Sequence, residues 1–357
     1  MITNITDKTM LTLPAIPPVN LVAQTSARAR QNLLTKPAGS LGQLEDLAVQ
    51  LAAITGQLNP SLARKAIIVM AGDHGIAREG VSAFPAEVTP QMVMNFLHGG
   101  AAINVLARQA GARVIVVDVG VNAEFEPLPG LERCKVARGT QNMARGPALT
   151  RTQAEDALAV GLKIVEQEVA RGLDVVATGD MGIGNTTPSA AICAVLTGRP
   201  VAQVTGRGTG VDDAGLQRKV TLIERALEVN HPDRSDPLDV LSKVGGLEIA
   251  GLAGVIIGGA AQRLPVVIDG FISGAAALIA TALAPEVKPY LIAAHQSVEI
   301  GHRAMLEHLG LRPLLNLNLR LGEGTGAALA FQLLDAALRI LNEMATFAEA
   351  GVSDKAA

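Results

Sequence analysis

Five short, largely apolar runs constrain the fold of this chain more than any other feature of its sequence. The runs are residues 66–71, 114–119, 174–178, 265–269 and 289–294, and glycine or polar residues stand at or directly after their ends. Runs of this kind are typical of strands buried on both faces of a parallel sheet. Because helical or loop segments separate them, the sequence predicts an α/β fold with a doubly wound, mainly parallel sheet. Such sheets bind ligands at the carboxyl ends of their strands.

Helical patterns occupy both ends of the chain. Apolar residues recur at helical spacing from residue 20 to 56, and the segment 36–40 interrupts them once. Ser40 is predicted to cap the helix that follows the interruption. Helical spacing returns from Ala327 to Ala350. The two ends are therefore predicted to be helical, unlike the strand-rich middle.

The charge balance argues against a nucleic-acid partner. The 357 residues include 30 Lys and Arg against 33 Asp and Glu, which leaves a net charge of −3 without any basic run. One Tyr and six Phe offer few platforms for base stacking. Proteins that bind single strands usually combine such platforms with a basic groove. Apolar residues make up 49% of the chain, enough for a large core.

Several features point to a protein of the reducing cytoplasm. Cys134 and Cys193 are the only cysteines, too few for a disulfide framework or for a zinc site built from thiolate pairs. Residues 1–20 lack the basic and apolar regions of a secretory signal. The Ala- and Gly-rich stretches 249–261 and 270–285 fall short of the roughly 20 apolar residues that span a bilayer. We expect them to be buried helices and expect no membrane partner.

A carboxylate stands among glycines near the end of the chain. In the segment 320–327, Arg-Leu-Gly-Glu-Gly-Thr-Gly-Ala, Glu323 is flanked by glycines on both sides. The apolar run 314–319 before it predicts a strand, and a helix is expected to begin near Ala327. Glycine lets the main chain approach a ligand closely, and helix starts favour anions. Glu323 is therefore predicted to face a ligand; the alternative is an ordinary glycine-rich turn with a solvated glutamate.

A second glycine-rich segment, residues 179–187, has the sequence Gly-Asp-Met-Gly-Ile-Gly-Asn-Thr-Thr. It follows a predicted strand and precedes a helix of small residues, so its main-chain and side-chain donors can converge on one oxyanion. The segment lacks the Gly-Lys-Ser/Thr element of a P-loop and does not match G-x-G-x-x-G. We predict a phosphate cradle. The alternative is that Asn185 and Thr186 are simple helix caps.

A third glycine loop, residues 205–213, is followed by Arg218 and Lys219 one or two helical turns later. Glycine N–H donors together with a cation suit a phosphate monoester. The alternative is a plain connecting loop with a solvated basic pair.

Histidines at two strand ends do not by themselves indicate catalysis. His74 follows Asp73 but has no further partner at metal-ligand spacing, which favours a structural hydrogen bond. His295 precedes Ser297 and Glu299, yet no Gly-x-Ser-x-Gly elbow surrounds the serine. The sequence therefore predicts neither a metal site nor a hydrolase triad.

Six segments in chain order carry a resemblance to one family. They are residues 36–45, 71–75, 179–187, 240–246, 269–271 and 320–327. Together they resemble the nicotinate-nucleotide:5,6-dimethylbenzimidazole phosphoribosyltransferases, which make α-ribazole phosphate for the lower ligand of cobalamin. The resemblance implies a homodimer and a Rossmann-like large domain, residues 63–294. It also implies a small helical domain built from both chain ends, residues 1–62 and 295–357.

The resemblance implies a role for Glu323 as the general base that takes a proton from a ring nitrogen of the benzimidazole. The other nitrogen attacks C1′ of nicotinate mononucleotide, nicotinate leaves, and the β-glycoside becomes an α-glycoside. Because the attacking base becomes cationic, a nearby carboxylate can stabilise it and remove the proton. Nicotinate bonded through its ring nitrogen is already a cationic leaving group. No metal or other cofactor is therefore implied.

Two sets of binding residues follow from the same resemblance. Those around the ribose phosphate and nicotinate are Gly182, Gly184, Asn185, Thr186, Gly206, Gly208, Lys219, Ser297 and Gly326. Those of the base pocket are Phe84, Gln91, Met92, Met181 and Leu321. An apolar pocket with one oriented carboxylate suits a flat heterocycle. The alternative for Phe84 and Met92 is a place in the core.

The chain departs from the family pattern at two places. Asp180, predicted as a supporting acid, is one methylene shorter than the Glu expected there, and the segment 80–92 differs from the small-residue version of some members. Base preference can differ accordingly, so transfer to adenine, another benzimidazole or a phenol is an alternative. A non-catalytic nucleotide-binding regulator on the same fold is a second one. The carboxylate of Glu323 favours the enzyme over the regulator, because a protein that only binds the nucleotide gains nothing from an anion beside the sugar.

Overall fold

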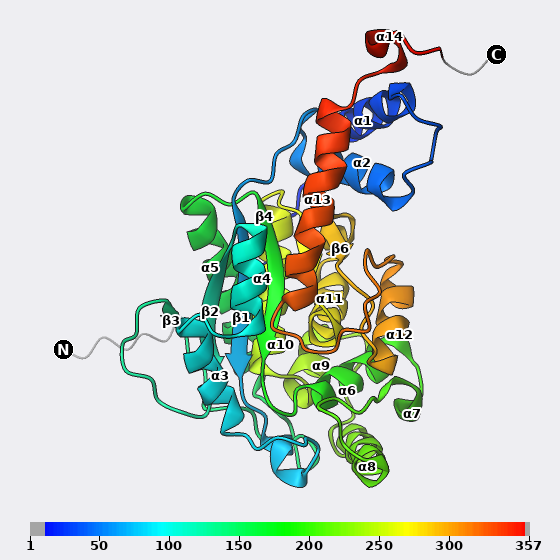
Figure 1. The fold of residues 1–357 in the computed structure, drawn as a ribbon. Helices are drawn as coiled ribbons and strands as arrows, with labels where there is room; N and C mark the ends of the chain where they lie inside the picture. The colour runs from blue at the N-terminus through cyan, green and yellow to red at the C-terminus, as the bar shows by residue number, and fades with distance from the viewer. Residues whose placement is uncertain (1–10, 354–357) are drawn as a thin grey trace.

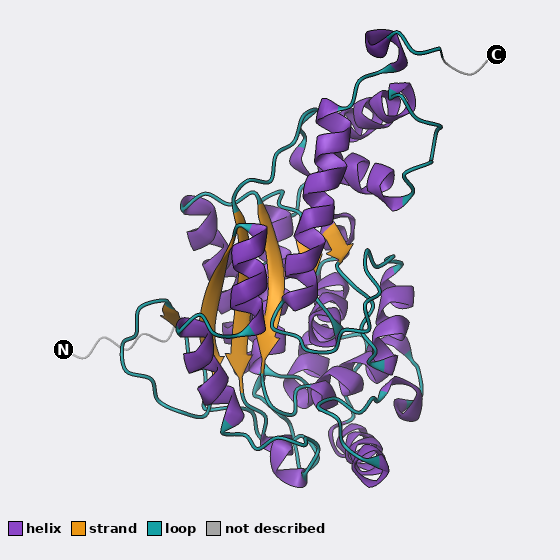
Figure 2. Cartoon of the chain, in the orientation of Figure 1, coloured by secondary structure: helices purple, strands orange, loops and turns teal. Residues whose placement is uncertain are grey.

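The computed structural model describes residues 11–353, in which six parallel strands form one sheet with helices on both faces (Figures 1 and 2). The strands are β1 (Lys65–Gly72), β2 (Ala112–Gly120), β3 (Leu131–Arg133), β4 (Val175–Met181), β5 (Val266–Ile268) and β6 (Leu291–Ala293). Their order in the sheet is β3-β2-β1-β4-β5-β6. This is the order of a doubly wound sheet, whose switch point lies between β1 and β4. The predicted fold class is confirmed.

All five predicted runs contain strands, although the bounds differ. Strand β4 extends to Met181, so that Gly179 and Asp180 lie inside the strand rather than after it. Strand β3 was not predicted, because its three residues, Leu-Glu-Arg, form an edge strand without an apolar run.

Alternate residues of β1 supply the two layers of the core. Ile68 and Met70 pack on the layer formed with α5 and α10, whereas Ile67 and Val69 pack on the layer formed with α4 and α13. Since successive side chains of a strand point to opposite faces, an uninterrupted apolar run is what a doubly covered strand requires. The covering helices are α4 (Ala102–Ala110), α5 (Arg151–Ala170), α10 (Leu247–Ala261) and α13 (Thr325–Glu343).

The two Ala- and Gly-rich stretches form the buried helices α10 and α11 (Phe271–Leu283), as predicted. Helix α10 packs on α5 with almost no space between the two backbones, since a Cβ on Gly161 or Gly254 would collide with a carbonyl oxygen of the other helix. Among residues 11–353, no helix combines the length and the apolar character needed to cross a membrane.

Helices α1 (Leu21–Leu33) and α2 (Gln43–Thr55) pack beside α13 at one end of the molecule, where α14 (Phe347–Ala350) also lies (Figure 1). Arg30 fixes this contact by donating hydrogen bonds to the carbonyls of Leu341 and Met344. Helix α12 (Ile300–Leu309) packs on α11 and on α6 (Thr186–Thr197). The division into residues 63–294 on one side and 1–62 with 295–357 on the other stays a prediction.

The predicted cap at Ser40 is wrong. The N-cap of α2 is Gly42, with φ +55° and no side-chain hydrogen bond. The loop before the helix is held instead by Glu45, which accepts from the N–H groups of Gly39 and Leu41 and pairs with the buried Lys36 at 2.8 Å. A carboxylate in the first turn thus replaces the cap.

The predicted strand at residues 314–319 is also wrong. Only Leu315 forms a bridge, to His295, and the segment otherwise runs as a loop in which Asn318 is left-handed with φ +54°. The helix expected near Ala327 begins two residues earlier, at Thr325, and a break at residues 344–346 separates it from α14. Leu317 of this loop is 54% exposed, so its apolar residues do not all enter a core. Apolar content alone therefore does not distinguish this loop from a strand.

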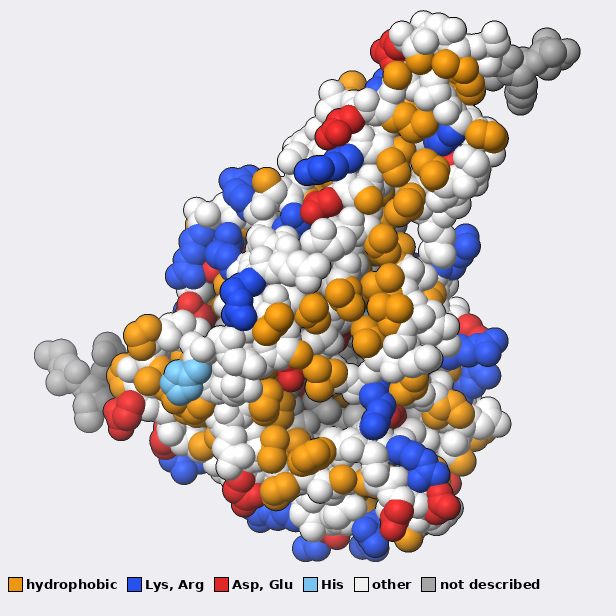
Figure 3. All heavy atoms as spheres, viewed as in Figure 1, with side chains coloured by type: hydrophobic (Ala, Val, Ile, Leu, Met, Phe, Trp, Pro, Cys, Tyr) orange, Lys and Arg blue, Asp and Glu red, His pale blue; other side chains and the backbone are white. Residues whose placement is uncertain are grey.

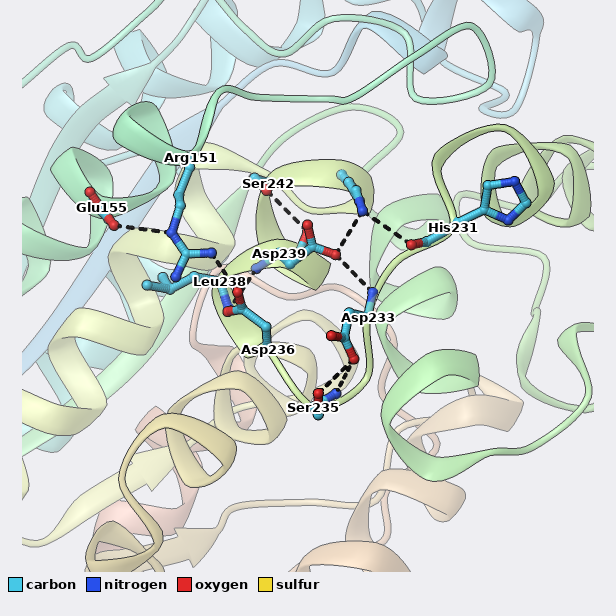
Figure 4. Close-up of polar contacts among 10 residues, drawn as sticks. Arg151, Glu155, His231, Asp233, Ser235, Asp236, Leu238, Asp239 and Ser242 are labelled. Carbon is cyan, nitrogen blue, oxygen red and sulfur yellow. Dashed lines mark hydrogen bonds and ion pairs between the residues drawn. The ribbon is translucent and has the colours of Figure 1, made fainter.

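A polar network fixes the start of α9 (Pro237–Val244) against α5 (Figure 4). Asp236 caps α9 by accepting from the N–H groups of Leu238 and Asp239, and its other oxygen pairs with Arg151 at 2.6 Å. This network has a structural role. The remaining elements are η1 (Gly75–Glu79), α3 (Val88–Leu97), α7 (Val201–Val204), α8 (Asp213–Asn230) and η2 (Pro285–Tyr290).

Candidate active site

The loop of Glu323 rests directly on the end of β4, beside the switch point. The Glu323 N–H donates to the Asp180 carbonyl at 3.3 Å, and a Cβ on Gly179 would collide with the Glu323 carbonyl oxygen. Arg320 connects the same loop to the third glycine loop by donating to the Gly208 carbonyl at 3.2 Å. Segments far apart in sequence therefore meet at the edge where ligands of such sheets bind.

Glu323 is a buried carboxylate held by an unusual backbone. Gly322, Glu323 and Gly324 are all left-handed, with φ of +84°, +63° and +94°. This conformation costs a residue with a Cβ about 1–2 kcal/mol, so the surrounding contacts must enforce it. The side chain is 5% exposed, which excludes the solvated turn as an alternative.

The side chain of Glu323 points to the start of α4. Its Oε2 accepts from the N–H of Ile103 at 3.2 Å, where the helix terminus favours a negative charge. Burial nevertheless raises the pKa of Glu323, and the hydrogen bond from Ile103 only partly opposes the rise. A carboxylate with a raised pKa is a stronger proton acceptor than an exposed one, as general-base catalysis requires.

Asp269, directly after β5, holds the far side of this loop. Its carboxylate accepts from the N–H groups of Gly324 at 3.3 Å and Ala327 at 3.0 Å. Burial raises the pKa of Asp269 to about 7 and lowers the pKa of the neighbouring His295 to about 4, so this histidine is neutral at pH 7. Asp269 was not among the predicted site residues, although its place at the end of an apolar run could have identified it.

Gly326 gives a test of how tightly this loop is packed. A Cβ at this position would collide with Nδ1 of the buried His295. Gly326→Ala is therefore expected to lower the free energy of unfolding by about 1–3 kcal/mol, as overpacking does. Gly146→Ala is the control, since a Cβ there meets nothing within 4 Å. Equal melting temperatures for the two variants would contradict the close contact.

The second glycine segment connects Asp180 to the start of α6. Asn185 donates to Asp180 Oδ2 at 2.9 Å and makes no side-chain cap, so its alternative as a simple helix cap is wrong. Gly182 packs against the Gly72 carbonyl of β1, where no Cβ would fit. Burial, together with the nearby Asp269 carboxylate, raises the pKa of Asp180 well above its usual range.

Lys219 brings a buried cation to the same segment. Its side chain is fully buried, and Nζ donates to Thr186 Oγ1 at 2.8 Å. A Cβ on Gly208 would lie 3.0 Å from Nζ, so the third glycine loop passes close to the amine. Burial lowers the pKa of Lys219 to about 8, although the Glu299 charge opposes this. The solvated pair is wrong for Lys219, whereas Arg218 is exposed and donates to Gly80.

Ser297 lies between β6 and α12 and is 6% exposed. Its N–H donates to Nδ1 of His302 at 2.9 Å, and its hydroxyl accepts from the Glu299 N–H at 3.3 Å. These two partners, His302 and Glu299, were not among the residues that the sequence assigned to the site. A Cβ on Gly270 would lie 3.2 Å from the His295 ring and 3.9 Å from Ser297 Cβ, so Gly270 lies close to both residues.

The segment 80–92 borders the site through hydrogen bonds to two of the glycine loops. Ser82 and Thr209 exchange a hydrogen bond at 3.0 Å between their hydroxyls, and Thr89 accepts from the Ile183 N–H at 3.1 Å. Phe84 is 54% exposed, so the core alternative is wrong for it. The other members of the predicted base pocket are Gln91 and Leu321, which are exposed, and Met92 and Met181, which are half-buried. Their grouping into one pocket stays a prediction.

His74 has the structural role that was favoured for it. Its Nε2 lies 2.8 Å from Glu248 Oε1, and both side chains are buried. Burial disfavours the cation, but the Glu248 carboxylate outweighs this and raises the pKa of His74. Within residues 11–353, no three His, Cys, Asp or Glu side chains are grouped as metal ligands.

Comparison with known proteins identifies the family. A phosphoribosyltransferase family profile matches residues 16–352. A relative from Chloroflexus aurantiacus (strain ATCC 29366 / DSM 635 / J-10-fl) is 60% identical over 98% of this chain and 99% of its own. One from Roseiflexus sp. (strain RS-1) is 61% identical over 96% of this chain and 98% of its own. Both are named nicotinate-nucleotide–dimethylbenzimidazole phosphoribosyltransferase.

A solved structure agrees with these relatives. The crystal structure of CobT from Thermus thermophilus superposes with a TM-score of 0.91 at 52% identity, covering 94% of this chain and 100% of that one. Similarity of this extent, in sequence and in fold, shows that the chain belongs to the nicotinate-nucleotide–dimethylbenzimidazole phosphoribosyltransferase family.

Proposed function

We propose that the protein transfers the phosphoribosyl group of nicotinate mononucleotide to 5,6-dimethylbenzimidazole, giving α-ribazole 5′-phosphate and nicotinate. The observation that carries the proposal is the buried, left-handed Glu323 at the end of β4, with the cation of Lys219 on the neighbouring glycine loops. A proton acceptor and an anion anchor in one site suit a base that must attack a phosphorylated sugar.

The anchor fixes the 5′-phosphate of the nucleotide. Lys219 and Thr186 supply a cation and a hydroxyl, and the start of α6 supplies main-chain donors. The other residues proposed around the nucleotide are Gly182, Gly184, Asn185, Gly206, Gly208, Ser297 and Gly326. Holding the phosphate places C1′ at a fixed distance from the base, and this alignment is the larger part of the catalytic task.

Glu323 then acts on the base. One benzimidazole nitrogen attacks C1′ as the bond from C1′ to the nicotinate nitrogen breaks, and the electron pair of that bond stays on nicotinate. The proton of the other ring nitrogen passes to Glu323, so the product is neutral in its ring. Asp180 supports this step as a second acid beside the loop, since a Cβ on Gly322 would lie 3.1 Å from its Oδ1.

The acceptor base occupies the side of the site bordered by α3. Phe84, Gln91, Met92, Met181 and Leu321 are the residues proposed to contact it. The exposed faces of Phe84 and Leu321, 54% and 57%, support a role in binding a flat apolar ring.

We further propose that the protein forms a homodimer and acts in the cytoplasm. Figure 3 shows hydrophobic side chains gathered beside α13 and over the surface below it. Large exposed side chains near the site include Val298, Ile300, Leu317 and Leu321. Patches of this kind often mark subunit contacts. Sedimentation of the purified protein checks this, and a monomer at micromolar concentration would contradict it.

Incubation with nicotinate mononucleotide and an equimolar mixture of 5,6-dimethylbenzimidazole, adenine and phenol tests the function. We expect one nicotinate released per ribotide formed, with the dimethylbenzimidazole product in excess by mass spectrometry. Excess of another product would favour the alternative acceptor. Nucleotide binding without nicotinate release for any base would favour the non-catalytic regulator.

A further inference from the structure

Glu299 carries a buried carboxylate oxygen without a hydrogen-bond partner. Its side chain is 7% exposed, and Oε2 accepts no hydrogen bond from any residue in the range 11–353. A buried acceptor without a donor costs about 1–3 kcal/mol. Buried polar groups are nearly always paired, so this oxygen is expected to meet a donor when the protein works.

The position of Glu299 is next to the proposed nucleotide anchor. The residue lies between β6 and α12, and its own N–H is bound to the hydroxyl of Ser297. A Cβ on Gly206 would collide with Oε2, so the third glycine loop passes directly over the carboxylate. In the described chain Glu299 forms no ion pair with Lys219, whose Nζ donates to Thr186. The carboxylate oxygen is thus close to the cation without being neutralised by contact.

The chemistry of the nucleotide narrows the choice of donor. The phosphate dianion and the nicotinate carboxylate of nicotinate mononucleotide carry only acceptors, and its pyridinium nitrogen has no proton. The proton of the benzimidazole goes to Glu323. The 2′- and 3′-hydroxyls of the ribose are therefore the donors that remain among the substrates.

We infer that Glu299 accepts a hydrogen bond from a ribose hydroxyl of nicotinate mononucleotide and thereby selects ribose over deoxyribose. The inference rests on the proposed function. It adds a specificity-determining residue beside the proposed phosphate anchor, and it gives a reason for a carboxylate next to an anion site.

Three nucleotides and four proteins test this inference. For the wild type, we expect kcat/KM to be about 10- to 100-fold lower with either the 2′-deoxy or the 3′-deoxy nucleotide, as for the loss of a charge-assisted hydrogen bond. Glu299→Ala is expected to lower kcat/KM for nicotinate mononucleotide to the level of that analogue and to leave the analogue nearly unchanged. Glu299→Gln, which keeps the shape, is expected to be intermediate. Glu307→Ala, at an exposed position of α12, the helix that follows Glu299, is the control.

The outcomes separate a sugar contact from other roles. A wild type that uses all three nucleotides equally would overturn the inference without any variant. Equal losses on all three nucleotides in Glu299→Ala would also overturn it, because a structural role or an effect through Lys219 does not distinguish the sugars. If the wild type releases no nicotinate from any of them, the proposed function fails. Calorimetric binding of the same three nucleotides then decides the role of Glu299.

Discussion

Glu323→Gln is expected to lower turnover at saturating substrates by about a hundredfold or more, the usual effect of losing a general base. The amide fills the same volume and can keep a hydrogen bond to Ile103, but it cannot take a proton from the base. Binding of nicotinate mononucleotide is expected to change little, because its anchor lies on the other glycine loops. Stopped assays of nicotinate release, together with calorimetry of nucleotide binding, separate the two effects.

The pH dependence sharpens this prediction. Since burial raises the pKa of Glu323 and the base must be ionised, wild-type turnover falls as the pH drops through that raised value. The residual activity of Glu323→Gln should lack this acidic limb. Glu343→Gln, an exposed change at the other end of α13, controls for loss of a charge. Near wild-type turnover of Glu323→Gln would exclude the base role.

Lys219→Met is expected to weaken binding of nicotinate mononucleotide by roughly a hundredfold, within the 2–5 kcal/mol typical of a buried charge partner. Methionine keeps the apolar stem in its buried place and removes only the cation. Binding of 5,6-dimethylbenzimidazole should be nearly unaffected. Calorimetry with each substrate measures both, and equal losses for nucleotide and base would contradict the phosphate assignment. The neighbouring exposed change Arg218→Met is the control.

The titration of Lys219 gives the sign of a further effect. Its pKa of about 8 in the folded chain means that the cation is lost as the pH rises through 8, so nucleotide affinity should fall there. Lys219→Met should show a flat profile over the same range. For the free energy of unfolding of the unliganded protein, the effect of pH has the opposite sign. The unfolded chain binds more protons between pH 8 and 10.5, so stability rises with pH through this group.

The sequence predicted the elements that depend on local pattern. The run containing Ile67 to Met70 has to alternate between two apolar layers, and no other fold class repeats such runs between helices. The glycine segment at the end of β4 likewise placed Asp180 at the right edge of the sheet, whereas Glu323 lies at this edge although the strand predicted before it is a loop. These predictions succeeded because strand burial and backbone freedom are properties of neighbouring residues.

Contacts between distant residues could not be predicted in this way. The hydrogen bond from Ile103 to Glu323 joins residues 220 positions apart, and nothing in the sequence around Ile103 indicates it. The run 314–319 looked like a strand because apolar content does not report whether a sheet edge is available. Glu299 follows His295 closely in the sequence, near the end of a predicted strand. Its unpaired oxygen could not be predicted, because it depends on how the distant loop that contains Gly206 passes over it.

Helix α13 has a mechanical consequence for the site. It starts two residues after Glu323 and, through Leu341, is bonded to Arg30 of the N-terminal helices at its other end. Nineteen residues of α-helix form a stiff rod of roughly 28 Å at about 1.5 Å per residue. A tilt of about 5° at the far end would shift the near end by roughly 2.5 Å, more than a hydrogen bond tolerates. The hydrogen bond from Arg30 to Leu341 therefore helps to hold the Glu323 loop in place from the far end of the helix.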